Sequence, residues 1–143
     1  MKSLLSLLLF PLLIACSTSP QPLVVGQDVC FYCKMPVVDS KFGAEVITAK
    51  GKLYKFDDVG CMSNFLKSGF DKNESIKTIV AVCYTNNNQL LDVQSAFFLR
   101  SPALHSPMNS GIAAFNSKQE ATSMQKNFPG EILSWEQIQQ QTY

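Results

Sequence analysis

The chain has a single histidine and little charge of either sign, and both scarcities narrow what it can do. Only 16% of its 143 residues are charged, and the formal net charge is +1. No basic stripe is present, so the electrostatic footprint of a nucleic-acid-binding protein is missing. With one histidine and no Ser-His-Asp set, P-loop or Gly-x-Gly-x-x-Gly motif, the sequence offers no catalytic architecture. We therefore expect a binding protein that is not an enzyme.

The sequence also lacks an apolar run long enough to cross a bilayer, which takes about 20 residues. The apolar run at residues 4–14 follows the cationic Lys2 and has the length of a secretory h-region. It leads into Leu-Ile-Ala-Cys, which ends at Cys16 and has the form of a lipobox. We expect residues 1–15 to be a lipoprotein signal peptide and Cys16 to carry the lipid. An ordinary cleaved signal or a buried apolar helix is the alternative.

The stretch after the lipobox is small, polar and rich in proline, so residues 16–27 are expected to be the lipidated cysteine and a flexible linker. Two acyl chains anchor a protein stably, and we expect the lipid anchor to be its only contact with the membrane. Ser17 favours the outer membrane weakly over the inner one. The expected location is the periplasmic side of the cell envelope, with residues 28–143 forming one small domain.

Hydrophobic periodicity and turn residues predict an α+β fold. Strands are expected at residues 42–49, 53–56, 76–84, 112–115 and 131–134, and helices follow the caps at Asp57-Asp58 and Asn116-Ser117. Residues 86–88 are predicted as a turn, residues 91–99 as a short loop before a strand, and the last residues as a helical turn. The order strand, strand, helix, strand occurs twice, which predicts two small ββαβ units packed together, at about residues 28–90 and 91–143.

The strongest chemical signal is a sulfur cluster formed by Cys30, Cys33 and Met35. Free thiols in an oxidising envelope need a reason, and soft thiolate and thioether ligands select Cu(I). Zinc would accept the thiolates but has no use for methionine. A Cys30–Cys33 disulfide beside a buried Met35, a redox dithiol and plain packing remain alternatives. The thiol of Cys83 lies in an apolar strand and is expected in the core.

Two further segments carry candidate ligands. Met108 lies on the loop Ser-Pro-Met-Asn-Ser-Gly, where no core periodicity places it, so we expect it to be presented to a ligand. His105, three residues earlier, is a candidate nitrogen donor beside it. Cys61 and Met62 are neighbours on a helix and diverge by about 100°. One of these two side chains is therefore expected in the core and the other at the site.

Taken in order, these motifs resemble the NosL family of nitrous-oxide reductase accessory lipoproteins. The resemblance rests on the lipobox, Cys-x-x-Cys-x-Met, Phe-Asp-Asp-x-Gly-Cys-Met and Ser-Pro-Met, and it covers residues 28 to about 138. It implies a pair of ββαβ units and a periplasm-facing chaperone that carries Cu(I) to apo nitrous-oxide reductase for its copper–sulfur centre. The implied second partner is a membrane ABC-type assembly complex.

The resemblance also implies which residues hold the metal. The motifs place ligands on Cys30, Cys33, Met35 and Met108, with additional or supporting roles for Cys61, Met62, His105, Asp57 and Asp58. Family members often have glycine after the loop methionine, whereas Asn109 stands here. Asparagine tolerates left-handed backbone geometry, so we expect the loop to be kept.

Two other functions compete with copper delivery. An envelope thiol–disulfide oxidoreductase would use Cys30 and Cys33, but such a motif normally opens a helix in a βαβ setting, and Pro36 disfavours a helix there. A structural lipoprotein would instead hold two disulfides and no metal. We favour the Cu(I) chaperone.

Overall fold

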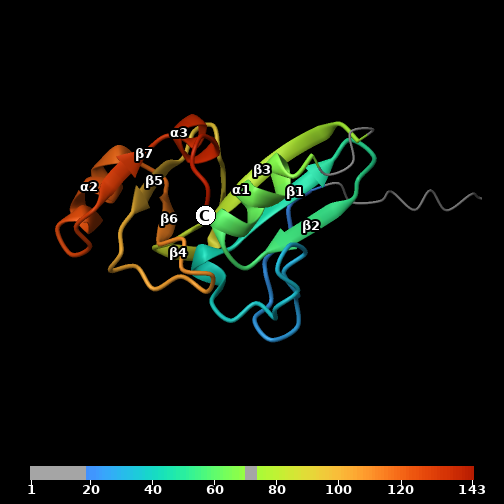
Figure 1. Ribbon diagram of the computed structural model, residues 1–143, viewed down its shortest axis with the longest axis horizontal. Helices are drawn as coiled ribbons and strands as arrows, with labels where there is room; N and C mark the ends of the chain where they lie inside the picture. Colours follow the sequence, from blue (N-terminus) through green and yellow to red (C-terminus); the bar gives the residue numbers. More distant parts are fainter. Residues whose placement is uncertain (1–18, 70–73) are drawn as a thin grey trace, which may run out of the picture.

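A computed structural model describes residues 19–69 and 74–143, so the predicted signal peptide and Cys16 lie outside the described residues. The described chain mixes strands and helices (Figure 1), which confirms the α+β class. Its elements are η1 (Ser40–Phe42), β1 (Ala44–Thr48), β2 (Leu53–Phe56), α1 (Val59–Lys67), β3 (Ile76–Cys83), β4 (Asn86–Asp92), β5 (Phe97–Arg100), β6 (Ile112–Phe115), α2 (Lys118–Gln125), β7 (Glu131–Leu133) and α3 (Trp135–Gln139). Within these ranges no helix has the length and apolar character needed to cross a membrane.

The strands of the described chain form one sheet in the order β2-β1-β3-β6-β5-β7, with β4 also paired to β3. Neighbours run antiparallel except β3 and β6, which are parallel and meet at Cys83 and Ala114. Strand, strand, helix, strand is the order over residues 44–83 and again over 97–133. Both stretches contribute to the same sheet (Figure 1), and their division into two packed units stays a prediction.

Strand β4 corrects the prediction for this part of the chain. The sequence predicts a turn at residues 86–88, but the turn is formed by Tyr84 and Thr85, and the strand begins at Asn86. Pairing with β3 outweighs the low strand propensity of asparagine. The register sets Leu91 opposite Ala81 and buries both, so tertiary contacts decide the conformation.

The two longer helices begin directly after their predicted caps. Asp58 caps α1, and Gly69, with a φ of +70°, follows the helix as the left-handed stop that its position predicts. Ser117 caps α2 by accepting the Glu120 N–H at 3.2 Å. Helix α2 ends at Gln125.

The core beneath the site is built from β1, β2 and α1. Every residue of β1 is buried, and Val59, Met62 and Phe65 of α1 pack in the same apolar cluster as Tyr54 and Phe56 of β2. The Phe65 ring lies 5.0 Å from the Phe56 ring, centroid to centroid. This packing fixes the junction between β2 and α1, from which site residues project.

Part of the predicted linker is fastened to the domain. The Gln21 N–H donates to Glu45 Oε2 at 3.0 Å, and the Gly26 N–H donates to the Val37 carbonyl at 2.9 Å. Leu23 is buried against Val37 and its neighbours. The packed part of the chain therefore begins before residue 28.

Candidate metal centre

The Cys-x-x-Cys segment is a closed turn. The Cys30 N–H donates to the Met35 carbonyl at 2.8 Å, and the Lys34 N–H donates to the Cys30 carbonyl at 2.9 Å. Lys34 has a left-handed φ of 64°, which is uncommon outside glycine. Its ammonium group compensates by donating to the Phe31 carbonyl and lying 3.9 Å from the centroid of the Phe31 ring. The Phe31 N–H in turn donates to the main-chain carbonyl of Lys55 in β2 at 2.8 Å, so the turn is held against the sheet.

Four potential metal ligands converge beside this turn: Cys30, Cys33, Asp57 and Cys61. One ligand atom of each, three thiol sulfurs and a carboxylate oxygen, lies within 4.8 Å of all the others. Asp57 comes from the junction between β2 and α1, and Cys61 comes from the first turn of α1. Cys30, Cys61 and Asp57 are buried, while Cys33 is half-buried, so the cluster lies at the edge of the core.

Hydrogen bonds and burial shift the pKa values of the four groups of the cluster in different directions. The Cys61 thiol donates to Cys30, which lowers the pKa of Cys30 to about 4 and raises the pKa of Cys61. Burial raises the pKa of Cys33 to about 11. Burial, followed by the neighbouring Cys30, raises the pKa of Asp57 to about 7. Cys30 is therefore the cysteine of the cluster that gives up its proton most readily, and a bound metal cation would displace the thiol protons of the other two.

Asp58 connects the methionine loop to this cluster. It accepts the Gly60 N–H at 2.7 Å as the cap of α1, and it also accepts the Met108 N–H at 3.1 Å and the Ser110 hydroxyl. Asn109 adopts the left-handed conformation that its residue type permits, with a φ of 60°, as the sequence predicts. One buried carboxylate thus fixes both the start of α1 and the position of the loop that carries Met108.

A small cavity of about 140 Å³ separates the loop from the helix. It is lined by Tyr32, Gly60, Cys61, Asn64, Met108, Ser110 and Tyr143. Cys61 belongs to both the cavity wall and the metal-ligand cluster, so the cavity that Met108 lines adjoins the cluster at Cys61. We call it the Cys61 cavity.

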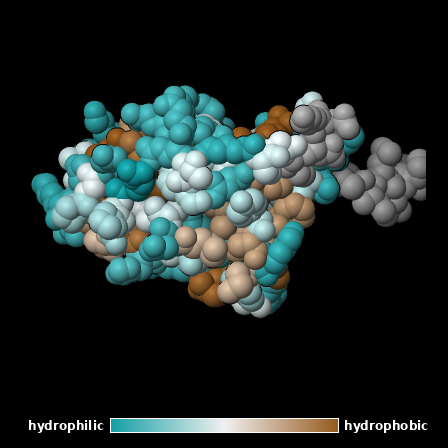
Figure 2. Space-filling view, in the orientation of Figure 1, coloured by the Kyte–Doolittle hydropathy of each residue, from teal (hydrophilic) through white to brown (hydrophobic). Residues whose placement is uncertain are grey.

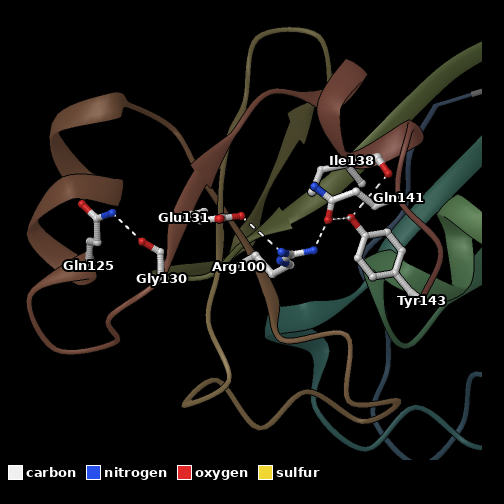
Figure 3. Close-up of polar contacts among 7 residues, drawn as sticks. All are labelled: Arg100, Gln125, Gly130, Glu131, Ile138, Gln141 and Tyr143. Atoms are coloured by element: carbon white, nitrogen blue, oxygen red, sulfur yellow. Dashed lines mark hydrogen bonds and ion pairs between the residues drawn. The ribbon is translucent and has the colours of Figure 1, made fainter.

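The last residues of the chain form one wall of the Cys61 cavity. Arg100 of β5 donates to Glu131 of β7 at 3.2 Å and to the side chain of Gln141 (Figure 3). The Tyr143 hydroxyl donates to the same Gln141 side chain at 3.3 Å and to the Ile138 carbonyl at 3.4 Å. This network, which Figure 3 shows, holds Tyr143 beside α1.

Gly60 permits that close approach. A Cβ at this position would lie 2.6 Å from the Ser110 Cβ and 3.1 Å from the Tyr143 Cβ. The Tyr143 carbonyl also accepts the Asn64 side-chain amide at 2.6 Å. The missing side chain of Gly60 therefore lets the loop and the last residue close around the first turn of α1.

The other predicted ligands differ in burial, and their part in metal binding stays a prediction. Met62 is fully buried in the core, whereas the Met35 side chain is 55% exposed and His105 is exposed. Cys83 is buried in β3, 3.3 Å from the Thr85 hydroxyl, and is not part of the cluster. The structure thus brings Cys30, Cys33, Cys61 and Asp57 together and adds Met108 across the cavity.

Sequence reasoning missed the roles of Asn64, Ser110 and Tyr143. Asn64 lies one helical turn after Gly60, and Ser110 lies in the predicted methionine loop, but neither has a metal-binding side chain that draws attention. Tyr143 is more than 80 residues from Cys61 in sequence, and no local pattern indicates its place. These residues are found only from the tertiary structure.

The geometry bears on the two competing functions. In a thioredoxin-like oxidoreductase the Cys-x-x-Cys motif stands at the start of a helix. Here the Cys-x-x-Cys segment forms a turn, and no helix begins at it. The four cysteines within the described ranges are all free thiols, so the two-disulfide arrangement is not what the structure contains. Three thiols beside a neutral thioether form a soft ligand set of the kind that prefers Cu(I).

Comparisons with known proteins agree with this arrangement. The family model described as NosL matches residues 23–143. The crystal structure of the copper chaperone NosL from Shewanella denitrificans is similar in fold, with a TM-score of 0.67 and 15% sequence identity. The match covers 86% of this chain and 97% of that chain. A search of curated proteins finds no match.

Proposed function

The chain belongs to the NosL family, and on this premise we propose that it is a copper chaperone that binds Cu(I) and passes it to another protein. The observation that carries the proposal is the convergence of three cysteine sulfurs and one carboxylate oxygen within 4.8 Å. Thiolates and thioethers select Cu(I) from the available metals. The ligand set lies at the edge of the core, where the buried ligands can hold a metal ion and the half-buried Cys33 leaves it within reach of a partner.

Each residue of the centre has a distinct part in the proposal. Cys30 supplies the thiolate that first attracts the cation, because its pKa is lowered by the Cys61 thiol. Cys61 and Cys33 then exchange their protons for the metal. Asp57, which accepts the Cys33 thiol at 3.6 Å, takes up a proton as Cys33 binds. Met108 adds a neutral donor from the loop that Asp58 fixes.

The proposed destination is apo nitrous-oxide reductase, with a membrane ABC-type assembly complex as the second partner. The support is the family membership together with the motif resemblance described above. The lipobox at Cys16 supports a lipid anchor on the periplasmic side of the envelope, with the outer membrane weakly favoured. A short tether there would raise the effective concentration of the domain near a membrane-bound partner.

The test is anaerobic titration of the reduced chain with Cu(I) against a chromophoric Cu(I) chelator, in a Cys16→Ser background so that only the described thiols are counted. We expect one tightly bound equivalent. Cys30→Ser should weaken binding by more than about a hundredfold, because loss of a ligand's supporting partner alone costs about 10–100-fold.

The matched control is Cys83→Ser, which removes a buried thiol outside the cluster and should leave the affinity unchanged. The proposal is wrong if the parent binds no Cu(I). It is also wrong if Cys30→Ser and Cys83→Ser bind copper equally tightly.

A further inference from the structure

The Cys61 cavity has room for one side chain. Its volume of about 140 Å³ is close to the roughly 150 Å³ of an engineered protein cavity that admits benzene. Cys61 and Met108 both form part of its wall, so a group that enters the cavity comes beside two of the proposed copper ligands. The cavity is therefore placed to admit a ligand that belongs to another molecule.

Among the described side chains that line the cavity, only the Cys61 thiol and the two tyrosine hydroxyls are ionisable, and a buried carboxylate lies behind them. Asp58 is buried next to the cavity, and its carboxylate is already bonded to the Gly60 and Met108 N–H groups and the Ser110 hydroxyl. An incoming carboxylate or thiolate would lose its water and meet this negative charge, and both effects are unfavourable.

An imidazole would also enter at a cost. One ring nitrogen would bind the copper, and the other would need its own hydrogen-bond partner in the cavity: an acceptor if it carries a proton, or a donor if it does not. The Asn64 side chain, the one side-chain amide among the described residues that line the cavity, already gives one N–H to the Tyr143 carbonyl at 2.6 Å, so an imidazole would have to compete for its remaining polar atoms. A thioether has no proton to place, packs favourably against aromatic rings such as those of Tyr32 and Tyr143, and binds Cu(I).

The rim of the cavity is apolar as well. Tyr32 and Met108, which line the cavity, are 45% and 46% exposed, and Phe31, next to Tyr32 in the sequence, is 40% exposed. Figure 2 shows hydrophobic surface gathered on the side of the molecule formed by the N-terminal loops that carry the Cys-x-x-Cys turn. Exposed apolar side chains that cluster around a site mark a surface for another molecule.

We propose that the Cys61 cavity is the port through which the copper acceptor reaches the metal, and that the acceptor inserts a methionine thioether. This inference rests on the proposed function. In the exchange step a bond forms between Cu(I) and the acceptor sulfur, and the bond between Cu(I) and the Met108 sulfur breaks. Copper stays Cu(I), and no proton moves because both sulfurs are neutral.

The experiment measures how fast a bulky disulfonated Cu(I) chelator in excess removes copper from the loaded full chain, in the presence of a small relay ligand. The relay ligands are N-acetylmethionine amide, N-acetylhistidine amide and N-acetylaspartate amide. We expect the thioether to speed copper removal by about tenfold or more. The rate should level off as the thioether concentration rises, because a cavity can be filled. The other two ligands should have smaller effects that do not level off.

A variant that fills the cavity provides the second measurement. Asn64→Phe places a ring in the cavity and should abolish the acceleration by the thioether, while the thiols still bind one equivalent of Cu(I) in the equilibrium titration. Asn88→Phe, at an exposed position of β4, is the matched control and should behave like the parent.

The outcomes separate the two ideas. Equal acceleration by the imidazole or the carboxylate would overturn the thioether inference, and so would full acceleration in Asn64→Phe. A parent chain that binds no Cu(I) in the equilibrium titration would instead overturn the proposed function, and the inference with it.

Discussion

The buried carboxyl group of Glu45 should make the protein less stable as the pH rises from about 4.5 to about 7. Glu45 lies in β1 with no exposed surface, and burial raises its pKa from 4.5 to about 7. Its Oε2 accepts the Gln21 N–H, but its Oε1 has no hydrogen-bond partner. The surroundings therefore favour the neutral acid, although Lys55 lies near enough to reduce the effect.

The sign follows from the two pKa values. Below pH 4.5 the group is neutral in the folded and unfolded states, and its stabilising contribution is fully present. Above about pH 7 the folded state must hold a buried charge, and the contribution is lost. The difference between 4.5 and about 7 corresponds to about 3 kcal/mol of unfolding free energy, at about 1.4 kcal/mol per pH unit.

The assay is urea unfolding at pH 5 and pH 8, in reducing buffer, followed by the fluorescence of Trp135, the only tryptophan and a buried one. Glu45→Gln keeps the shape and stays neutral, so its stability should change less with pH than that of the parent, by up to about 3 kcal/mol. Glu131→Gln, at an exposed ion pair, should alter stability by less than about 1 kcal/mol at either pH. Parallel pH profiles for the parent and Glu45→Gln would refute the reasoning.

Three further changes test the packing around the candidate metal centre. Asp58→Ala should lower the unfolding free energy by about 2–3 kcal/mol, because it removes a helix cap and two bonds to the methionine loop; urea unfolding indistinguishable from that of the parent would contradict this. Gly60→Ala should destabilise the protein although alanine favours helix by about 1 kcal/mol, since its Cβ would lie 2.6 Å from the Ser110 Cβ; a raised melting temperature would disprove it. Asn109→Gly should melt like the parent while Asn109→Val loses about 1–2 kcal/mol, and equal melting of the two variants would show that the left-handed φ of 60° is not maintained.

Local signals in the sequence predict the part of the fold that holds the thiols. The Asp58 cap and the spacing of Val59, Met62 and Phe65 are enough to predict α1, and capping also predicts the start of α2. Strand β4 escapes prediction because its asparagines oppose the strand state locally, and only pairing with β3 overcomes them.

In the candidate site, too, some features can be predicted from the sequence and others depend on tertiary contacts. Cys30 and Cys33 are close in sequence, so their proximity in space is expected from spacing alone. The exposure of Met35 follows no sequence signal, because the left-handed turn at Lys34 involves a residue type that rarely adopts it. The addition of Asp57 to the thiols depends on how the β2–α1 junction packs against the turn, which is a tertiary contact.

The place of Tyr143 in the cavity wall also bears on how the protein is made. Synthesis proceeds from the N-terminus, so Cys30 and Cys33 leave the ribosome more than 100 residues before Tyr143 does. Cys61 follows early in that interval, but the Tyr143 side of the Cys61 cavity is still missing. The four potential metal ligands are therefore made well before the cavity beside them is closed by Tyr143.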